Sequence, residues 1–358
     1  MRGFPSTAAT RALFDWFAAS QRPLPWRREP RDPYRVWLSE VMLQQTRVAA
    51  MLPRYRTFVA RFPTLDALAG AQIDEVLAHF SGLGYYARAR HLHAAAKAAV
   101  ALGGLPQTAA ALAQLPGFGP YTAAAVASLA FGEQVPLVDG NVARVLARML
   151  RIRGSAAEVR ARAWEIAPAL LPEGRAARFN EALMELGATV CKPRAPSCGA
   201  CPLGSWCETR DRGDAHDFPP PKVVRERPLL VWAAAAVTRK DGSVLLRRHR
   251  EGELFAGTWG LPWREVSAAT PRRSARAALD DCGARAAALR SRGEVEQKLT
   301  HRALRVAVFS GPGDAPERED LRFVGPANFG SVGLSSLARK CLRACGIEQP
   351  VRAALQGG

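Results

Sequence analysis

Four cysteines in a short segment limit how this chain can fold more than any other feature does. Cys191, Cys198, Cys201 and Cys207 are spaced C-x6-C-x2-C-x5-C, and four thiolates are the usual ligands of a 4Fe–4S cluster. Paired zinc ribbons instead carry two C-x2-C knuckles about fifteen to twenty residues apart. A disulfide framework is typical of secreted proteins, and nothing else in the sequence suggests secretion. The spacing therefore favours an iron–sulfur loop over residues 191–207, with zinc and unligated thiols as the alternatives.

The overall charge points to a polyanionic partner. The chain of 358 residues has a formal net charge of +18, which indicates nucleic acid first, although a basic chain can also be merely soluble. Residues 1–20 lack the uninterrupted apolar core of a signal peptide. No stretch approaches the roughly twenty apolar residues of a membrane span. We therefore expect a cytoplasmic protein, in a reducing compartment that also suits an oxygen-sensitive cluster.

The pattern of apolar residues divides the chain. Up to about residue 211, apolar positions recur at helical spacing, as in residues 142–149. A polar stretch with three consecutive prolines follows, and beyond it Asp241-Gly242 is a hairpin signal between strand candidates. We therefore expect an all-α domain over residues 1–211, a stiff, solvated linker over 212–228, an α+β domain over 229–346 and a tail over 347–358.

A glycine-containing turn separates two predicted helices, 108–114 and 121–131. Gly117 and Gly119 allow backbone conformations in which several amide groups point at one anion. The N-terminus of the second helix adds a partial positive charge. Such a turn can grip one DNA phosphate without reading sequence. An ordinary connection between two helices is the alternative.

Two carboxylates provide a minimal set of groups for cleaving an N-glycosidic bond, by analogy with sugar hydrolysis. Glu40 has apolar neighbours on a predicted helix, where burial would raise its pKa and make it a general acid. Asp139 precedes a predicted helix, whose dipole would hold the carboxylate ionised opposite a developing cation. A solvated glutamate and a plain helix N-cap are the alternatives.

These motifs occur together in one known family. From Leu24 to Cys207 the chain resembles the helix-hairpin-helix DNA glycosylases with an iron–sulfur cluster, and within them it most resembles the MutY family of adenine DNA glycosylases. The matching stretches are SEVMLQQT at 39–46, GLGYYARAR at 82–90, the turn at 115–122, LVDGNV at 137–142 and the four cysteines. The resemblance implies an all-α glycosylase domain with its hairpin at about 108–131, a bound 4Fe–4S cluster and double-stranded DNA as the partner.

The resemblance also implies catalytic roles. Glu40 would protonate the target adenine, and Asp139 would stabilise the oxocarbenium-like sugar, either electrostatically or through a transient covalent bond. Asn141 would orient Asp139 or the attacking water. Tyr121 stands where strand-cutting relatives carry a Schiff-base lysine, and residues 98–191 contain no lysine. We therefore expect a monofunctional glycosylase that excises adenine paired with 8-oxoguanine or guanine in base excision repair.

The same match implies which residues hold the substrate and the DNA. The adenine pocket would be lined by Arg22, Leu24, Arg27 and Glu181. One extra residue before Glu40 leaves Arg28 as an alternative to Arg27. The duplex would be contacted by Gln45, Thr46, Leu83, Tyr85, Gly117 and Gly119. Of these, Gln45 and Tyr85 would wedge into the base stack. The neighbouring Tyr86 would instead pack within the protein. We expect the protein to act as a monomer.

Residues from about 229 resemble, more weakly, the Nudix-like C-terminal domain of the same family. Ala277 and Asp280-Asp281 replace glutamates of a working Nudix box, so too few carboxylates remain to hold magnesium for nucleotide hydrolysis. The family recognises 8-oxoguanine through a Phe-Ser-His loop, where this chain reads Leu299-Thr300-His301. We expect Thr300 and His301 to contact the DNA there.

Three other functions stay open at this point. An endonuclease-III-like pyrimidine glycosylase with lyase activity shares the cluster and Asp139, but Tyr121 disfavours it. A non-catalytic DNA-binding protein with an iron–sulfur cluster would not need Glu40. A Nudix hydrolase would cleave nucleotides with magnesium.

Overall fold

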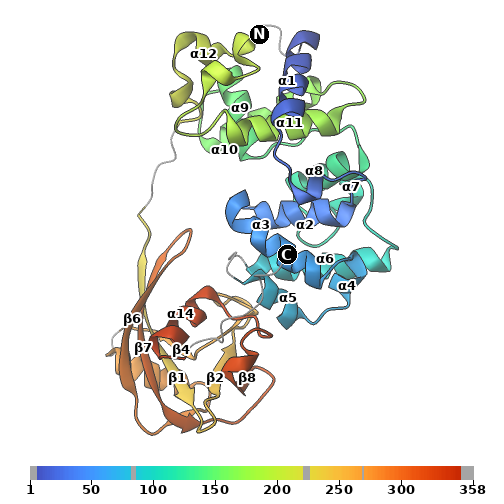
Figure 1. Ribbon diagram of the computed structural model, residues 1–358. Helices are drawn as coiled ribbons and strands as arrows, with labels where there is room; N and C mark the ends of the chain where they lie inside the picture. The colour runs from blue at the N-terminus through green and yellow to red at the C-terminus, as the bar shows by residue number, and fades with distance from the viewer. Residues whose placement is uncertain (1–5, 82–85, 221–225, 268–269, 348–358) are drawn as a thin grey trace. The chain divides into compact units, whose positions relative to one another are not determined.

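The computed structural model describes residues 6–81, 86–220, 226–267 and 270–347 (Figure 1). Its internal contacts divide the chain into two compact units. The first unit combines Met1–Ala49, Thr64–Ala69 and Ala94–Val224, and the second combines Ala50–Pro63, Gly70–His93 and Arg225–Gly358. None of the helices in the described ranges is long and apolar enough to cross a membrane.

The first unit is helical. Its elements are α1 (Thr7–Ser20), α2 (Pro33–Leu43), α4 (Leu65–Ala69), α7 (Ala109–Leu112), α8 (Pro120–Phe131), α9 (Gly140–Met149), α10 (Ala156–Ile166), α11 (Ala176–Thr189), α12 (Glu208–Arg212) and the C-terminal part of α6 (Tyr86–Ala101). Helices α1, α8, α9 and α11 enclose a core that includes Phe14, Phe17, Leu146 and Phe179. Burying each such side chain contributes about 1.5–3 kcal/mol, so this core holds the helices that carry the site.

Local sequence signals fix the start of two helices that matter for the site. Asp32 is the N-cap of α2, where its side chain accepts hydrogen bonds from the backbone N–H groups of Tyr34 and Arg35, and Pro33 occupies the first helical position. Asp139 caps α9 in the same way. The N-cap that the sequence left open as the alternative for Asp139 is therefore present.

The predicted turn lies between α7 and α8. Gly117 has a φ of +75°, a left-handed conformation that favours glycine, and Gly119 is the N-cap of α8. Between them the ring of Phe118 stacks on Trp37 of α2 at 5.3 Å. The turn is therefore anchored to the helix that carries Glu40.

One aromatic residue near the start of the expected linker is packed on the first unit. Phe218 is buried, its carbonyl accepts a hydrogen bond of 2.7 Å from Arg148 Nε, and the guanidinium of Arg151 lies 4.9 Å from its ring centre. Phe218 thus packs against α9, whereas Arg212, His216 and Asp217 are exposed; the bounds of the linker stay a prediction.

The second unit contains an eight-stranded sheet in its described part, with helices on both faces. The central strands are β1 (Leu229–Thr238) and β7 (Ala303–Asp314), which are parallel. Around them pair β2 (Val244–Arg248), β3 (Trp259–Gly260), β4 (Trp263–Glu265), β5 (Arg285–Ala286), β6 (Arg290–Lys298) and β8 (Leu321–Val324). Ala234 and Ala236 of β1 belong to the hydrophobic core between the sheet and α14 (Ser336–Ala344). Ala233 and Ala235 belong to a second core, between the opposite face of the sheet and α13 (Pro271–Asp280). The predicted α+β class and the hairpin after β1 are confirmed.

The second unit also includes helices from the N-terminal half of the sequence, α3 (Val48–Arg61) and α5 (Ile73–Phe80). Asp74 at the start of α5 accepts hydrogen bonds from Arg248 at 2.6 Å, from Trp259 Nε1 at 3.2 Å and from Arg322 at 3.4 Å. Tyr86, 4% exposed, donates to the carbonyl of Leu334. The expectation that Tyr86 packs is confirmed, and the sheet is bound to α5 and α6 by specific polar contacts.

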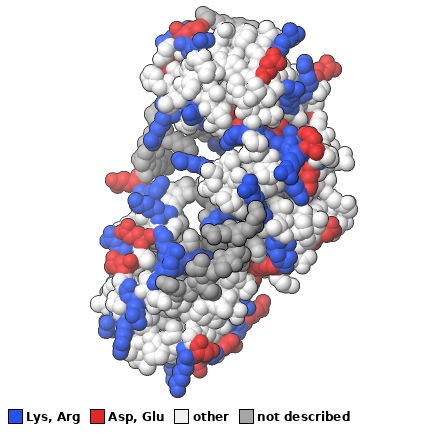
Figure 2. Space-filling model, viewed as in Figure 1, with Lys and Arg blue, Asp and Glu red and all other residues white. Residues whose placement is uncertain are grey.

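Basic side chains are spread over the surface. On the face in Figure 2, blue Lys and Arg side chains outnumber red Asp and Glu side chains, as the net charge of +18 requires. Such a surface suits a polyanionic partner.

Candidate active site

A cleft in the first unit brings most of the predicted site residues together. It has a volume of about 1580 Å³ and lies among α2, α8, α9, α11 and the segment before α2. The predicted residues that line it are Arg22, Leu24, Arg27, Glu40, Gln45, Thr46, Gly117, Gly119, Tyr121, Asp139, Asn141 and Glu181.

Glu40 projects from α2 into this cleft and is only 4% exposed. Burial raises the pKa of its carboxyl to about 7, and the negative charges of Asp139 and Glu181 add to the rise. A hydrogen bond from Tyr121 acts in the opposite direction. Near neutral pH Glu40 therefore holds a proton that it can donate, as a general acid requires.

Tyr121, the second residue of α8, is the immediate partner of Glu40. Its hydroxyl donates a hydrogen bond of 2.5 Å to Glu40 Oε2. Burial and the two nearby carboxylates raise the pKa of Tyr121 well above its usual value. The phenol therefore stays protonated and acts as a donor that fixes one oxygen of Glu40.

Asp139 is held by the first turn of α9. Its Oδ1 accepts from the backbone N–H groups of Asn141 at 2.9 Å and Val142 at 2.7 Å, and its Oδ2 accepts from Asn141 Nδ2 at 2.7 Å. These donors lower its pKa, but burial has the larger effect and the pKa is raised. Burial and the hydrogen bonds at the start of α9 thus act on this carboxyl in opposite directions, and the expectation that the helix dipole holds it ionised stays a prediction.

Asn141 connects Asp139 to the cysteine segment. Arg144 donates to Asn141 Oδ1, to the carbonyl of Cys191 and to the carbonyl of Gly187, each at 2.8 Å. A Cβ at Gly187 would lie 2.6 Å from the Cβ of Asn141, so α11 can approach α9 this closely only with glycine there. The position of the Asp139 carboxylate is therefore tied to that of the first cysteine.

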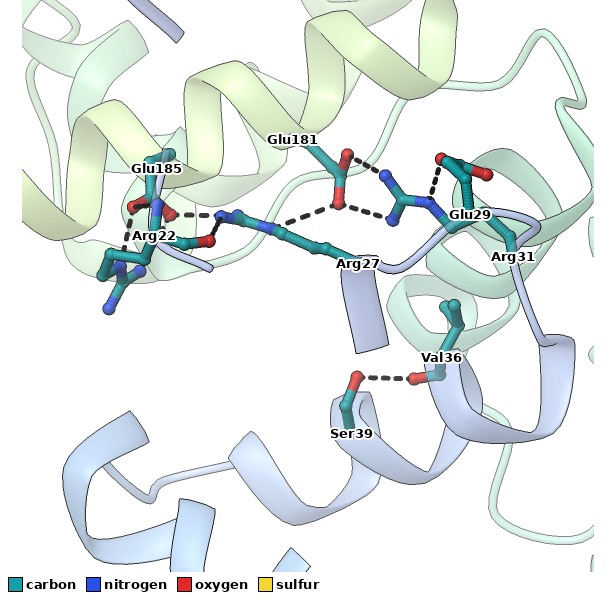
Figure 3. Close-up of polar contacts among 8 residues, drawn as sticks. All are labelled: Arg22, Arg27, Glu29, Arg31, Val36, Ser39, Glu181 and Glu185. Carbon is teal, nitrogen blue, oxygen red and sulfur yellow. Dashed lines mark hydrogen bonds and ion pairs between the residues drawn. The ribbon is translucent and has the colours of Figure 1, made fainter. Parts of the chain in front are cut away.

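One wall of the cleft is a row of alternating charges (Figure 3). In order along the wall, these are Arg22, Glu185, Arg27, Glu181 and Arg31. Arg27 lines the cleft whereas Arg28 is exposed and does not line it. The ambiguity between these two arginines is thereby resolved by position.

Two members of this row, Arg31 and Glu185, were missed by the sequence reasoning. Glu185 follows Glu181 by four residues on α11 and so shares its helix face, a spacing that could have identified it. Arg31 directly precedes the N-cap Asp32, and no local signal distinguishes it from its neighbours.

The four predicted metal ligands also come together. Cys191, Cys198, Cys201 and Cys207 line one cavity with residues of α9 and α11, and all four are free thiols. Arg148 of α9 donates a hydrogen bond to Cys191 Sγ at 3.3 Å. Within the described ranges, no three His, Cys, Asp or Glu side chains gather tightly enough to hold a single metal ion.

The remaining predicted DNA contacts are Leu83, Tyr85, Thr300 and His301. Leu83 and Tyr85 lie outside the described residues. Thr300 and His301 are exposed in the second unit, between β6 and β7, where Leu299 N donates to the carbonyl of Arg302 at 2.9 Å. Their roles stay predictions.

Comparison with known proteins identifies both halves of the chain. Residues 38–169 match the HhH-GPD superfamily base excision DNA repair proteins, and residues 233–344 match the NUDIX domain. Among solved structures, a thermostable thymine-DNA glycosylase is 30% identical with a TM-score of 0.51, covering 57% of this chain and 95% of that chain.

Curated relatives from distant organisms share one description, adenine DNA glycosylase. The human protein is 34% identical over 96% of this chain and 75% of its own length. The Mycobacterium tuberculosis protein is 41% identical over 61% of this chain and 74% of its own length. The rat protein is 44% identical over 58% of this chain, but the match spans only 42% of the rat sequence. The chain belongs to the MutY family of adenine DNA glycosylases, and it is a glycosylase of base excision repair.

Proposed function

We propose that this enzyme excises adenine paired with 8-oxoguanine or guanine by hydrolysing the N-glycosidic bond, without cutting the strand. The observation that carries the proposal is the buried Glu40, whose pKa is raised to about 7, facing the same cleft as Asp139. Two carboxylates in one cleft, one of them ready to donate a proton, are what departure of a purine base requires.

In this mechanism Glu40 donates its proton to a ring nitrogen of the flipped adenine. The protonated base leaves as a neutral molecule, so the glycosidic bond breaks with less charge separation. Tyr121 holds the carboxyl of Glu40 in place through its hydrogen bond of 2.5 Å. Flipping the base costs a few kcal/mol, which contacts to the duplex offset.

Asp139 stabilises the positive charge that develops on the sugar. Its pKa is raised by burial, and an adjacent cation would lower it. The attraction between the two charges is therefore greatest as the oxocarbenium-like sugar forms. Asn141 keeps the carboxylate oriented through its hydrogen bond of 2.7 Å.

Strand cleavage by a Schiff base needs a desolvated amine at the sugar. Tyr121 occupies the hairpin position and is committed to Glu40. Lys192 lines the cleft, but it is exposed and therefore is poorly suited to act as the nucleophile. We expect an abasic product with an intact backbone.

Duplex contacts are proposed for the hairpin, for Gln45, Thr46, Leu83 and Tyr85, and for Thr300 and His301. Gln45 supports this assignment, because it is exposed with a φ of +58°. A non-glycine residue in that conformation stores strain of the kind found at functional sites. Thr300 and His301 present a hydroxyl and an imidazole at an exposed turn, where they can recognise 8-oxoguanine opposite the adenine.

The cysteine residues fit a 4Fe–4S cluster. Four free thiols surround one cavity, a donor set typical of such clusters, and the guanidinium of Arg148 can stabilise a thiolate at Cys191. When bound, the cluster would link the four cysteines of the 191–207 loop to one another, in a cavity that residues of α9 and α11 also line. Because one chain supplies the whole cleft, we also propose that the enzyme acts as a monomer. We further propose that it acts in the cytoplasm.

A single-turnover assay tests the proposed function. The substrate is a duplex with one adenine opposite 8-oxoguanine, and each time point is divided into samples with and without alkali. Breakage only after alkali is expected. Breakage in both samples would indicate lyase action, and breakage in neither would refute the glycosylase assignment for this substrate.

A further inference from the structure

Four of the five charged residues in the wall of the cleft form an inner and an outer pair (Figure 3). The family resemblance places the inner residues, Arg27 and Glu181, in the adenine pocket together with Arg22 and Leu24. The outer residues are Glu185, which contacts Arg27, and Arg31, which contacts Glu181. The outer residues have no assigned role.

Glu185 fixes Arg27. Its side chain is 0% exposed and accepts hydrogen bonds from Arg22 Nε at 2.6 Å, from Arg22 Nη2 at 2.9 Å and from Arg27 Nη2 at 2.9 Å. Arg27 Nη1 also donates to the carbonyl of Arg22 at 3.3 Å. The end of the Arg27 guanidinium is thus held from two sides.

Arg31 fixes Glu181 through a two-pronged contact. Its Nη1 and Nη2 atoms donate to Oε1 and Oε2 of Glu181, both at 2.9 Å. Its Nε donates to Glu29 at 2.7 Å, which steadies the guanidinium. Such a fork determines the plane of the carboxylate as well as its position.

The contact between the two inner residues is looser than those outside it. Arg27 Nε and Glu181 Oε1 are 3.4 Å apart, compared with 2.9 Å for the outer contacts of each residue. A ligand edge can therefore engage the inner pair while the outer contacts persist. An ionised Glu offers only acceptors and an Arg only donors, and the edge of adenine presents the complement, an amino donor beside a ring-nitrogen acceptor.

We propose that Arg31 and Glu185 are positioning residues that hold Glu181 and Arg27 as the acceptor and donor reading that edge of adenine. This inference rests on the proposed function. Arg31 positions the acceptor Glu181 and so affects recognition of the amino group of adenine. Glu185 positions the donor Arg27 and so affects recognition of the ring nitrogen. Neither residue touches the reacting atoms.

The test compares adenine with purine, which lacks the 6-amino group, in the same duplex opposite 8-oxoguanine. Arg31→Met should reduce the single-turnover rate on adenine by about tenfold to hundredfold and change the rate on purine less than about threefold. Arg31→Lys keeps the charge but not the two-pronged contact, so its single-turnover rate on adenine should lie between those of the wild type and Arg31→Met. Arg28→Met removes the same charge from an exposed neighbour and should leave both rates unchanged.

A double substitution identifies the route of the effect. If Arg31 acts through Glu181, then Arg31→Met should change the adenine-to-purine rate ratio in the wild type but not in a Glu181→Gln background. If Arg31→Met lowers the rates on adenine and purine equally, its role is only structural and the inference is overturned. The inference is also overturned if neither rate changes. Failure of the wild type to release adenine would refute the proposed function instead, so the two failures are distinguishable.

Discussion

The cleft of the first unit and the connection between β2 and β3 of the second unit place carboxylates in opposite environments. In the cleft, burial and two neighbouring negative charges raise the pKa of Glu40 to about 7. In the second unit, hydrogen bonding from His249, together with Arg247, lowers the pKa of Glu253 to about 2. The first carboxyl can exchange a proton near neutral pH, and the second is a permanent anion that holds its neighbours. A glutamate beside other carboxylates can thus transfer a proton, whereas a glutamate beside His249 and Arg247 stabilises the fold.

The first and largest expected effect is that of Glu40→Gln, which keeps the shape and removes the acid. We expect the rate of adenine release to fall by about a thousandfold or more, because a general acid contributes about 10²–10⁴-fold and the leaving group here depends on it. Single-turnover kinetics measure this loss, with duplex binding as the control that the cleft is intact. Near-wild-type excision would refute the mechanism and favour a different acid.

The next prediction compares two helix caps. Asp139 and Asp32 both accept backbone hydrogen bonds at the start of a helix, and Asn is an equally good cap. Asp139→Asn should therefore keep the fold but reduce excision by about 10²–10³-fold, since the charge opposite the sugar is lost. Asp32→Asn should leave the rate within about twofold. Equal effects in the two variants would reduce Asp139 to a structural cap.

In the second unit, the corresponding prediction concerns stability. Asp74→Ala leaves Arg248, Arg322 and Trp259 without their shared acceptor and should lower the free energy of unfolding by about 1–3 kcal/mol. The rate of base release at saturating enzyme should not change. Denaturant unfolding measures the loss, with the exposed Asp66→Ala as control. A large catalytic defect in a folded Asp74→Ala protein would show that the two regions are not separable in this way.

A smaller effect is expected at Tyr121, and it appears in the pH profile. The Tyr121 hydroxyl stabilises the carboxylate of Glu40 and so lowers its pKa, which means that Tyr121→Phe should raise that pKa. Because the protonated form is the active one, the wild-type rate should decline as pH rises through about 7. The decline should move to higher pH by about one unit in the variant. A movement to lower pH would contradict the assigned hydrogen bond.

The two regions also differ in how much their sequences reveal. The caps at Asp32 and Asp139 could be predicted because a cap depends on residues two and three positions away. Arg31 and Asp74 could not, because their partners Glu181 and Arg248 lie 150 and 174 residues away along the chain. The balance of burial against hydrogen bonding at Asp139 was likewise inaccessible, since the packing that desolvates it comes from several helices. Sequence therefore reveals which groups are present, and packing decides their charge and partners.

The smallest expected effect tests whether the second unit contributes to recognition as well as cohesion. Thr300 is exposed between β6 and β7, and one hydrogen bond to a neutral group contributes about 0.5–1.5 kcal/mol. Thr300→Ala should therefore reduce the preference for 8-oxoguanine over guanine by about two- to tenfold while leaving the rate on the guanine pair unchanged. Ser267→Ala, which removes another exposed hydroxyl of the same unit, serves as the matched control. If both variants keep the wild-type preference, other residues recognise the base opposite adenine. The turn between β6 and β7 then contributes nothing to recognition.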